Sequence, residues 1–323
     1  IYRSSRHGVS EMYERADFAA SFSGTYAELV LTDANPPSPE GFGEANKKLY
    51  QNKNEEGNAV QYFFESGSWR VVDASGNTFF FGTDAIARQS DPKDASKTFR
   101  WFLQKVQNIH GDTIEYGYTS SGLSGIASAT SENQTYLDTI RWSFTNGKPL
   151  YEAKLSYIKK AKAVSSYQAG FKIETDQLIN KISVFVNATQ TPRVQHSLGD
   201  VGRLISEYTL AYADENTATP KLTSITQQAG EVTLSAIRFE YYENSGSVHL
   251  LKTIDNGIGG KISLSYSPSV KYKDLQGTRQ NMNLPFIIQT LKQIEYADTI
   301  AGVSEMKTFS YAGGHYYYSD KDV

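Results

Sequence analysis

The sequence predicts an all-β protein, built as a large curved antiparallel sheet of consecutive hairpins with little helix. Aromatic residues make up 13% of the chain, and 22 Tyr against 3 Trp suit the pleated, half-buried surface of strands. Short apolar segments recur on either side of Gly- and Asn-containing turns. Some of these segments are apolar on both faces and others alternate, a mixture that favours a large curved sheet over a compact sandwich.

Composition narrows the classes of function. The chain has 323 residues, enough for two average domains or one large β structure, and its net charge of −3 gives no electrostatic footprint for nucleic acid. It has no Cys, which excludes disulfides and thiol chemistry, and no apolar run approaches a membrane span. Because it opens at Ile1 without an initiator Met or a signal-peptide pattern, we expect an internal segment of a longer protein.

The first 80 residues contain a loop and a hairpin. Helical spacing of apolar residues over 9–16 predicts at most one helical turn. Residues 33–60 are rich in Pro and Gly and predict a long ordered loop. Residues 69–72 and 78–81 are apolar and flank the turn residues 73–77, which predicts a β-hairpin.

The same pattern returns with residues 99–103, the turn at 110–112 and the strand 113–118. A looser repeat follows, in which a strand ends on Tyr and the next opens with Leu-x-x-Ile or a close variant. Tyr212 precedes one such step and Tyr242 another; the steps begin at Leu137, Ile179, Leu222, Leu251 and Leu291. Strands of similar length joined by polar turns predict one continuous antiparallel sheet. A β-sandwich whose strands share a composition is the alternative.

Motifs in collinear order carry a resemblance to a known family. The first part of the chain resembles SpvB-type domains in Arg6-His7-Gly8-Val9, Glu28-Leu29-Val30, Ser68-Trp69-Arg70-Val71, Asp73-x-x-Gly76-Asn77, Ser90-Asp91-Pro92 and Gly111-Asp112-x-Ile114-x-Tyr116-x-Tyr118. The last part resembles the TcdB-type middle region in Asp255-Asn256-Gly257-x-Gly259-Gly260, Leu284-Pro285-Phe286 and Tyr311-x-Gly313-Gly314-His315-Tyr316. Only 145–200 lack such motifs.

This resemblance to B components of Tc toxins, within the wider Rhs/YD-repeat family, has implications for organisation and function. It implies an SpvB-like strand region over 1–125, with the loop at 33–60, and a YD-like hairpin region over 126–323 that continues the same sheet. It implies a secreted virulence protein whose β-sheet shell encapsulates a C-terminal toxic cargo. The implied partners are the remainder of the same polypeptide or a C-type subunit with cargo, and a translocation component.

We predict no catalytic, cofactor-binding or metal-binding residue, and hence no enzyme. The five His residues lack metal-ligand spacing: His7, His110, His196, His249 and His315. No nucleophile elbow or phosphate-binding loop occurs. SpvB-type proteins can end in an ADP-ribosyltransferase with a Glu-x-Glu pair, and this pair is absent from the sequence.

Two groups of residues have both a structural and a ligand-binding interpretation. Asp73 with Asn77, and Asp255 with Asn256, offer oxygens that suit calcium, whereas a turn role explains both without a metal. Aromatic residues such as those at 316–318 would stack on sugars, whereas cross-strand packing is the commoner role. A cell-surface adhesive or glycan-binding β module is therefore the alternative function, and a hydrolase has no support.

Overall fold

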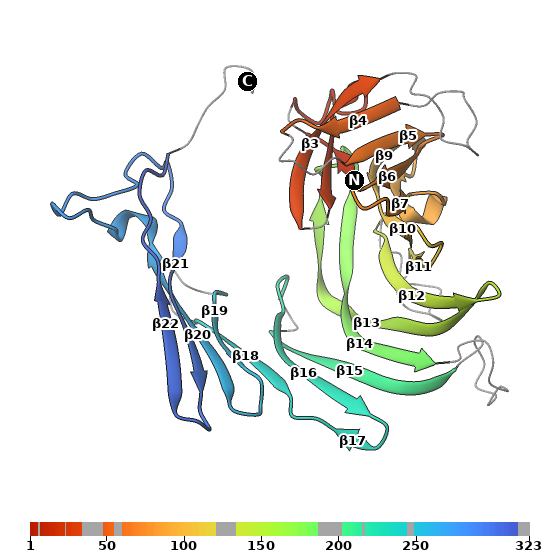
Figure 1. Cartoon of the computed structure of the whole chain (residues 1–323). Helices are drawn as coiled ribbons and strands as arrows, with labels where there is room; N and C mark the ends of the chain where they lie inside the picture. Colours follow the sequence, from red (N-terminus) through yellow and green to blue (C-terminus); the bar gives the residue numbers. More distant parts are fainter. Residues whose placement is uncertain are drawn as a thin grey trace. The chain divides into compact units, whose positions relative to one another are not determined.

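The computed structural model describes residues 1–5, 7–22, 24–33, 48–54, 60–120, 134–186, 202–214, 217–243 and 249–315. Apart from two short 3₁₀ turns, the regular elements in this part of the chain are strands of one sheet, and all pairings between them are antiparallel. The prediction of an all-β antiparallel fold is confirmed. The chain divides into two compact units, Ile1–Ser206 and Glu207–Val323 (Figure 1). The boundary predicted between 125 and 126 lies outside the described residues.

The elements run in chain order as a succession of hairpins. The first unit holds β1 (Tyr2–Arg3), β2 (Phe18–Phe22), β3 (Thr25–Asp33), β4 (Lys48–Asn52), β5 (Gln61–Glu65), β6 (Ser68–Val72), β7 (Thr78–Phe81), η1 (Ala85–Ala87), β8 (Arg88–Asp91), β9 (Asp94–Trp101), β10 (Leu103–Gln107), β11 (Thr113–Thr119), β12 (Tyr136–Thr145), β13 (Lys148–Ser166), β14 (Ile173–Val186) and the start of β15 (Arg203–Ala213). The second continues with β16 (Lys221–Ala229), β17 (Val232–Thr233), β18 (Ile237–Tyr241), β19 (Leu251–Asp255), β20 (Gly260–Pro268), η2 (Ser269–Lys271), β21 (Gln289–Asp298) and β22 (Val303–Thr308).

The N-terminal strands close into a ring. Each of β1 to β6 pairs with the next strand, β7 pairs with β10, and β9, which runs into β10, pairs back with β1. Aromatic side chains fill the interior: the Phe18 ring lies 4.9 Å from that of Trp69 and 5.8 Å from that of Trp101, both edge-on. Large aromatic rings bury much apolar area, so they supply the core of this closed sheet.

Strand β4 lies inside the segment 33–60, so the prediction of a loop throughout that segment is wrong over 48–52. Tyr50 on this strand is 1% exposed and packs edge-on against Phe18, at 5.5 Å between ring centroids. The Pro and Gly residues at 36–43 dominate the sequence pattern and hide a strand of only five residues. The remainder of the predicted loop, over 34–47 and 55–59, lies outside the described residues.

The turn predicted over 9–16 is held by hydrogen bonds rather than by a helix. The N–H groups of Glu14 and Arg15 both donate to the carbonyl of Glu11. Met12 on this turn is 2% exposed and packs with Phe99 and Phe171 in a second apolar cluster. The apolar residues with helical spacing therefore serve one turn that covers the strands. In the described part of the chain, no helix is long and apolar enough to cross a membrane.

The second unit is a single layer of strands, drawn cyan to blue in Figure 1. Among the described residues, every fully buried apolar side chain belongs to the first unit. Strand register nevertheless gives the second unit one apolar face, which carries Leu210, Tyr212, Leu222, Ile225, Ile237, Phe239, Tyr241, Leu251, Ile254, Ile262, Leu264, Tyr266, Leu291, Ile294 and Tyr296. We call this surface the apolar face. Sheets normally bury such a face against a second layer.

Candidate functional site

Among the described residues, no three or more His, Asp or Glu side chains gather where they could hold a metal ion. Nε2 of His7 lies 3.7 Å from a carboxylate oxygen of Asp17, and Nδ1 of His315 lies 2.6 Å from the carbonyl oxygen of Gly313. His110 and His249 are exposed in separate turns, and His196 lies outside the described residues. The structure therefore does not bring the histidines together, and the absence of a metal site stays a prediction.

The first calcium candidate is a hydrogen-bonded turn. One carboxylate oxygen of Asp73 accepts from the N–H groups of Ser75 and Asn77, each at 2.9 Å. The other accepts from the side-chain amide of Asn77, also at 2.9 Å. Gly76 between them has φ +79°, a backbone conformation that favours glycine. Both oxygens of Asp73 are thus engaged in closing the β6–β7 hairpin.

The same turn recurs at the β10–β11 hairpin with the two side chains exchanged. Here the side-chain oxygen of Asn108 accepts from the N–H groups of His110 and Asp112, each at 2.9 Å, and its amide donates to Asp112. In the second candidate, the side-chain oxygen of Asn256 accepts from the N–H groups of Ile258 and Gly260. The motif is therefore an Asx-closed hairpin turn, a role in which Asn and Asp are interchangeable.

The Leu-x-x-Ile step has a direct structural cause, which is a β-bulge. On a regular strand, residues i and i+3 point to opposite faces. At Leu251-x-x-Ile254, however, Leu251 lies opposite Tyr241 and Thr253 lies opposite Glu240, so Lys252 is an additional residue in the ladder. Such a bulge shifts the alternation by one residue, so Leu251 and Ile254 reach the same face.

The same bulge occurs at all the steps predicted from the sequence. In each, the leading Leu or Ile lies opposite a Tyr, and the closing Ile lies opposite the apolar residue two positions before that Tyr. The opposed pairs are Tyr118 with Leu137, Tyr157 with Ile179, Tyr212 with Leu222, Tyr241 with Leu251 and Tyr266 with Leu291. The sequence pattern marked Tyr242 as the tyrosine that precedes this step, and the residue opposite Leu251 is its neighbour Tyr241. We call this unit the bulged tyrosine hairpin.

Tyrosine hydroxyls bind successive hairpins to one another. The hydroxyl of Tyr157 donates to the carbonyl of Leu137 at 2.5 Å, and that of Tyr118 donates to Leu103 at the same distance. Burial raises the pKa of Tyr157 to about 12, which keeps the hydroxyl protonated as a donor at neutral pH. The tyrosines that pack across strands thus also carry polar links between hairpins, in keeping with the cross-strand packing role. The tyrosines at 316–318 lie outside the described residues.

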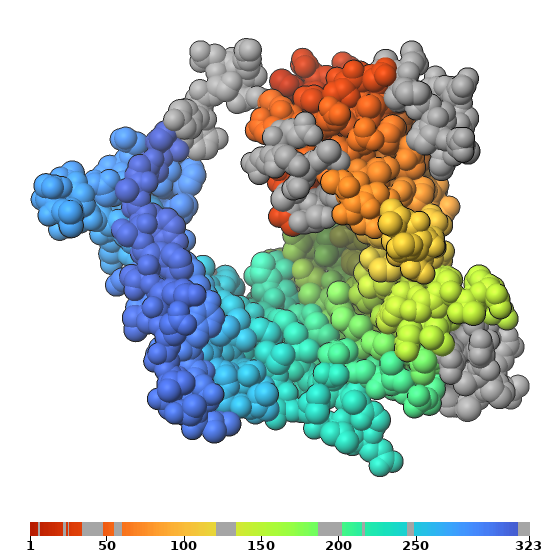
Figure 2. Space-filling view, in the orientation of Figure 1, coloured from red at the N-terminus to blue at the C-terminus, as the bar shows by residue number. Residues whose placement is uncertain are grey.

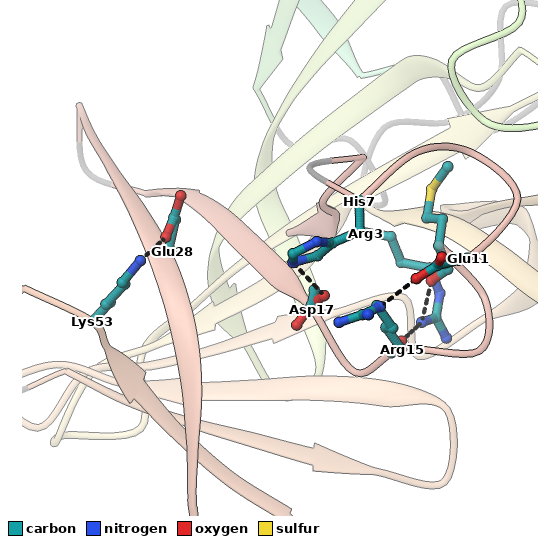
Figure 3. Close-up of polar contacts among 8 residues, drawn as sticks. Arg3, His7, Glu11, Arg15, Asp17, Glu28 and Lys53 are labelled. Atoms are coloured by element: carbon teal, nitrogen blue, oxygen red, sulfur yellow. Dashed lines mark hydrogen bonds and ion pairs between the residues drawn. The ribbon is translucent and has the colours of Figure 1, made fainter. Parts of the chain in front are cut away.

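Arg3 is a structural residue that sequence reasoning missed. Its guanidinium lies 4.9 Å above the ring of Phe18 and donates to the carbonyls of Thr98 at 2.9 Å and Arg15 at 3.0 Å. Burial lowers its pKa. Figure 3 shows Arg3 close to two ion pairs, Arg15 with Glu11 and His7 with Asp17, and also draws the pair of Lys53 with Glu28, which lies apart from them. A single Arg on a two-residue strand leaves no sequence signal, because its partners are main-chain carbonyls 12 and 95 residues away.

An open depression of about 620 Å³ lies on the apolar face over β19 to β22. Ile254, Ile262 and Tyr296 form its apolar floor, with Asp298 and Glu305 at its margin. One carboxylate oxygen of Asp298 accepts from the N–H groups of Ile300 and Ala301, so this side chain closes its own turn. The depression therefore offers apolar surface rather than a group poised for chemistry.

Two family models match the chain. The model described as Salmonella virulence plasmid 65kDa B protein matches residues 48–155, and that described as insecticide toxin TcdB middle/N-terminal region matches residues 222–323. A curated relative, mono(ADP-ribosyl)transferase SpvB of Salmonella choleraesuis, is 23% identical over 268 residues, which cover 67% of this chain and 44% of the relative. The chain thus spans less than half the length of the curated relatives that it matches.

Solved structures share the fold. The N-terminal domain of the effector SpvB from Salmonella typhimurium has a TM-score of 0.57 at 21% identity, and the match covers 71% of this chain and 86% of that domain. The TcdB2-TccC3-Cdc42 structure has a TM-score of 0.61 at 15% identity and covers 91% of this chain and 18% of that one. The Tc holotoxin pore of Photorhabdus luminescens has a TM-score of 0.60 at 17% identity, and the match covers 97% of this chain and 17% of that one.

Proposed function

We propose that this chain, which belongs with the SpvB/TcdB-type toxin components, is a non-catalytic wall segment of a secreted toxin shell that encapsulates a C-terminal toxic cargo. The observation that carries this proposal is the single-layer sheet of the second unit. One of its faces is apolar, and it has no fully buried apolar side chain among its described residues. A sheet of this kind suits a wall that separates a cavity from solvent.

The polar face supports the same role. On β20 and β21 the residues that alternate with the apolar ones are Lys261, Ser263, Ser265, Gln293 and Glu295. These side chains suit contact with water, and the alternation gives each side of the sheet a constant character. The wall therefore has a chemically distinct inner and outer surface, with the apolar face directed inward.

The partners follow from the names of the similar structures. TcdB2 is found with TccC3, and a Tc holotoxin contains a pore. We infer that this chain works with the remainder of its own polypeptide or with a C-type subunit that bears the cargo, and with a translocation component. In this view the bulged tyrosine hairpin is the YD-like unit of an Rhs-type shell, and any ADP-ribosyltransferase activity belongs to another part of the polypeptide.

The test is electron cryomicroscopy of the full polypeptide that contains this chain and its cargo, combined with limited proteolysis. We expect the apolar face of β16 to β21 to border a hollow interior and the cargo to resist protease. The cargo expressed by itself is the control and should be digested rapidly. If both faces contacted solvent and the cargo were digested at the control rate, the shell proposal would be wrong, and binding to a glycan array would then favour the adhesive module.

A further inference from the structure

The last described strand, β22, is followed by the tyrosine half of a bulged tyrosine hairpin. In each complete hairpin, the first strand carries an apolar residue, one spacer and Tyr, as in Phe239-Glu240-Tyr241 and in Leu264-Ser265-Tyr266. After β22 the chain reads Phe309-Ser310-Tyr311, which has the same form. Among the described strands, β22 pairs with β21 alone. Its Tyr therefore has no opposing Leu-x-x-Ile strand in the described part of the chain.

Main-chain groups along β22 are directed outward at every second residue. The N–H of Phe309 donates to the carbonyl of Lys292 at 2.8 Å, and Lys307 and Glu305 lie opposite Ile294 and Tyr296 in the same ladder. In an antiparallel pair, alternate residues direct their N–H and C=O groups to opposite sides of the strand. Those of Ser304, Met306 and Thr308 are therefore directed away from β21.

The outer edge is open to a partner. All six residues of β22 are exposed, and Val303 and Met306 retain 62% and 58% of their accessible surface. The dark blue atoms of this strand lie at the surface in Figure 2. A straight edge that exposes apolar side chains and main-chain donors is a template for a further strand.

The end of the strand is already held in position. The side-chain amide of Asn281 donates to the carbonyl of Tyr311 at 2.8 Å, and the ring of Tyr272 packs edge-on against that of Tyr311 at 5.5 Å. Asn281 is 7% exposed and also donates to the carbonyl of Ser269. Tyr311 is thus fixed from the side of β21, while the opposite edge of the strand stays accessible.

We propose that the outer edge of β22 is a docking site for an extended segment that opens with Leu-x-x-Ile. The segment pairs antiparallel to β22, with its Leu opposite Tyr311, its Ile opposite Phe309 and its second residue in a bulge. Continuity with the five complete hairpins sets this register, because each of them opposes Tyr and Leu across the same bulge. The role of this edge in a shell rests on the proposed function, whereas binding depends only on β22.

The probe is a fluorescent peptide with the sequence of residues 289–298, which contains Leu291-x-x-Ile294. Titration of the whole chain should raise the anisotropy of this peptide, and hydrogen exchange should slow at the outward amides of Met306 and Thr308, which the peptide reaches in the proposed register. A matched peptide in which Ser replaces both Leu291 and Ile294 keeps its main-chain groups and should bind about tenfold more weakly, because it loses the apolar contacts with Tyr311 and Phe309.

A pair of variants tests the edge itself. Met306→Pro removes one outward N–H without disturbing the ladder to β21 and should weaken binding about tenfold, since proline is tolerated on an edge but cannot donate. Met306→Ala keeps the N–H and is the control, with binding within about twofold of the unaltered chain. Equal binding by both variants, peptide-independent protection of these amides in a dimer, or no protection at all would each overturn the proposal. Peptide binding without a hollow shell would instead reject only the proposed function.

Discussion

The hydroxyl of Tyr241 on β18 donates to the main-chain carbonyl of Leu222 on the neighbouring strand β16, with 3.0 Å between the oxygens. Leu222 is also the residue that opposes Tyr212 across a bulge. One leucine thus belongs to its own hairpin through its side chain and to the next hairpin through its carbonyl. The same relationship joins Tyr118, Leu137 and Tyr157 in the first unit.

Removal of this hydroxyl should have a small, measurable cost. We expect Tyr241→Phe to lower the free energy of unfolding by about 1 kcal/mol, because the Leu222 carbonyl loses a donor. Tyr208→Phe is the control: no hydrogen bond of its hydroxyl is found in the described structure, and its change should stay below about 0.5 kcal/mol. Urea unfolding followed by fluorescence measures both, and equal effects would contradict the link.

Stability should fall at alkaline pH. Burial raises the pKa of Tyr157 and of Tyr62 to about 12, above the ordinary value of 10.0. Above pH 10 the unfolded chain loses these protons while the folded chain keeps them, so their contribution to stability is complete below pH 10 and is lost as the pH rises to 12. Melting temperatures measured across this range should show a steeper decline for the unaltered chain than for Tyr157→Phe. Parallel declines would argue against buried hydroxyls.

The bulge residue should be dispensable, whereas a residue of the regular strand opposite should not. Deletion of Lys252 leaves Leu251 and Ile254 two positions apart and on the same face, so we expect the free energy of unfolding to change by less than about 1 kcal/mol. Deletion of Glu240 instead places Phe239 and Tyr241 on opposite faces, and we expect a loss of roughly 1–3 kcal/mol from exposed apolar area. Chemical denaturation of the two variants side by side is the measurement. Equal losses would show that Lys252 is not an additional residue in the ladder.

Substitutions of Asp73 distinguish a structural role in the turn from a role in calcium binding. We expect Asp73→Asn to be nearly neutral, since Asn108 closes an equivalent turn with an amide. Asp73→Ala should lose about 1–2 kcal/mol with the turn's acceptor. Millimolar calcium should leave the melting temperature of the unaltered chain in place. A calcium-dependent rise that disappears in Asp73→Asn would restore the metal interpretation.

Local sequence signals were sufficient to predict the hairpins, but they did not predict that the N-terminal strands close into a ring. Asp73 to Asn77 and Asn108 to Asp112 close turns through neighbours two and four residues away, so a short window contains all their partners. The Leu-x-x-Ile step was visible as a pattern, but its meaning required the opposing Tyr. The closure of β9 against β1 joins Tyr2 to Arg100, and no local periodicity reports a contact over that separation.

The bulged tyrosine hairpin requires a particular type of residue at only a few positions. It constrains the Tyr, the apolar residue before it and the two ends of the Leu-x-x-Ile step, while the spacer residues vary among Asp138, Asn180, Thr223, Lys252 and Lys292. Gene duplication can therefore add or remove such a unit without redesign of its neighbours, as long as each added pair repeats those positions. Related chains are then free to differ in the number of hairpins while their sequences diverge almost everywhere else.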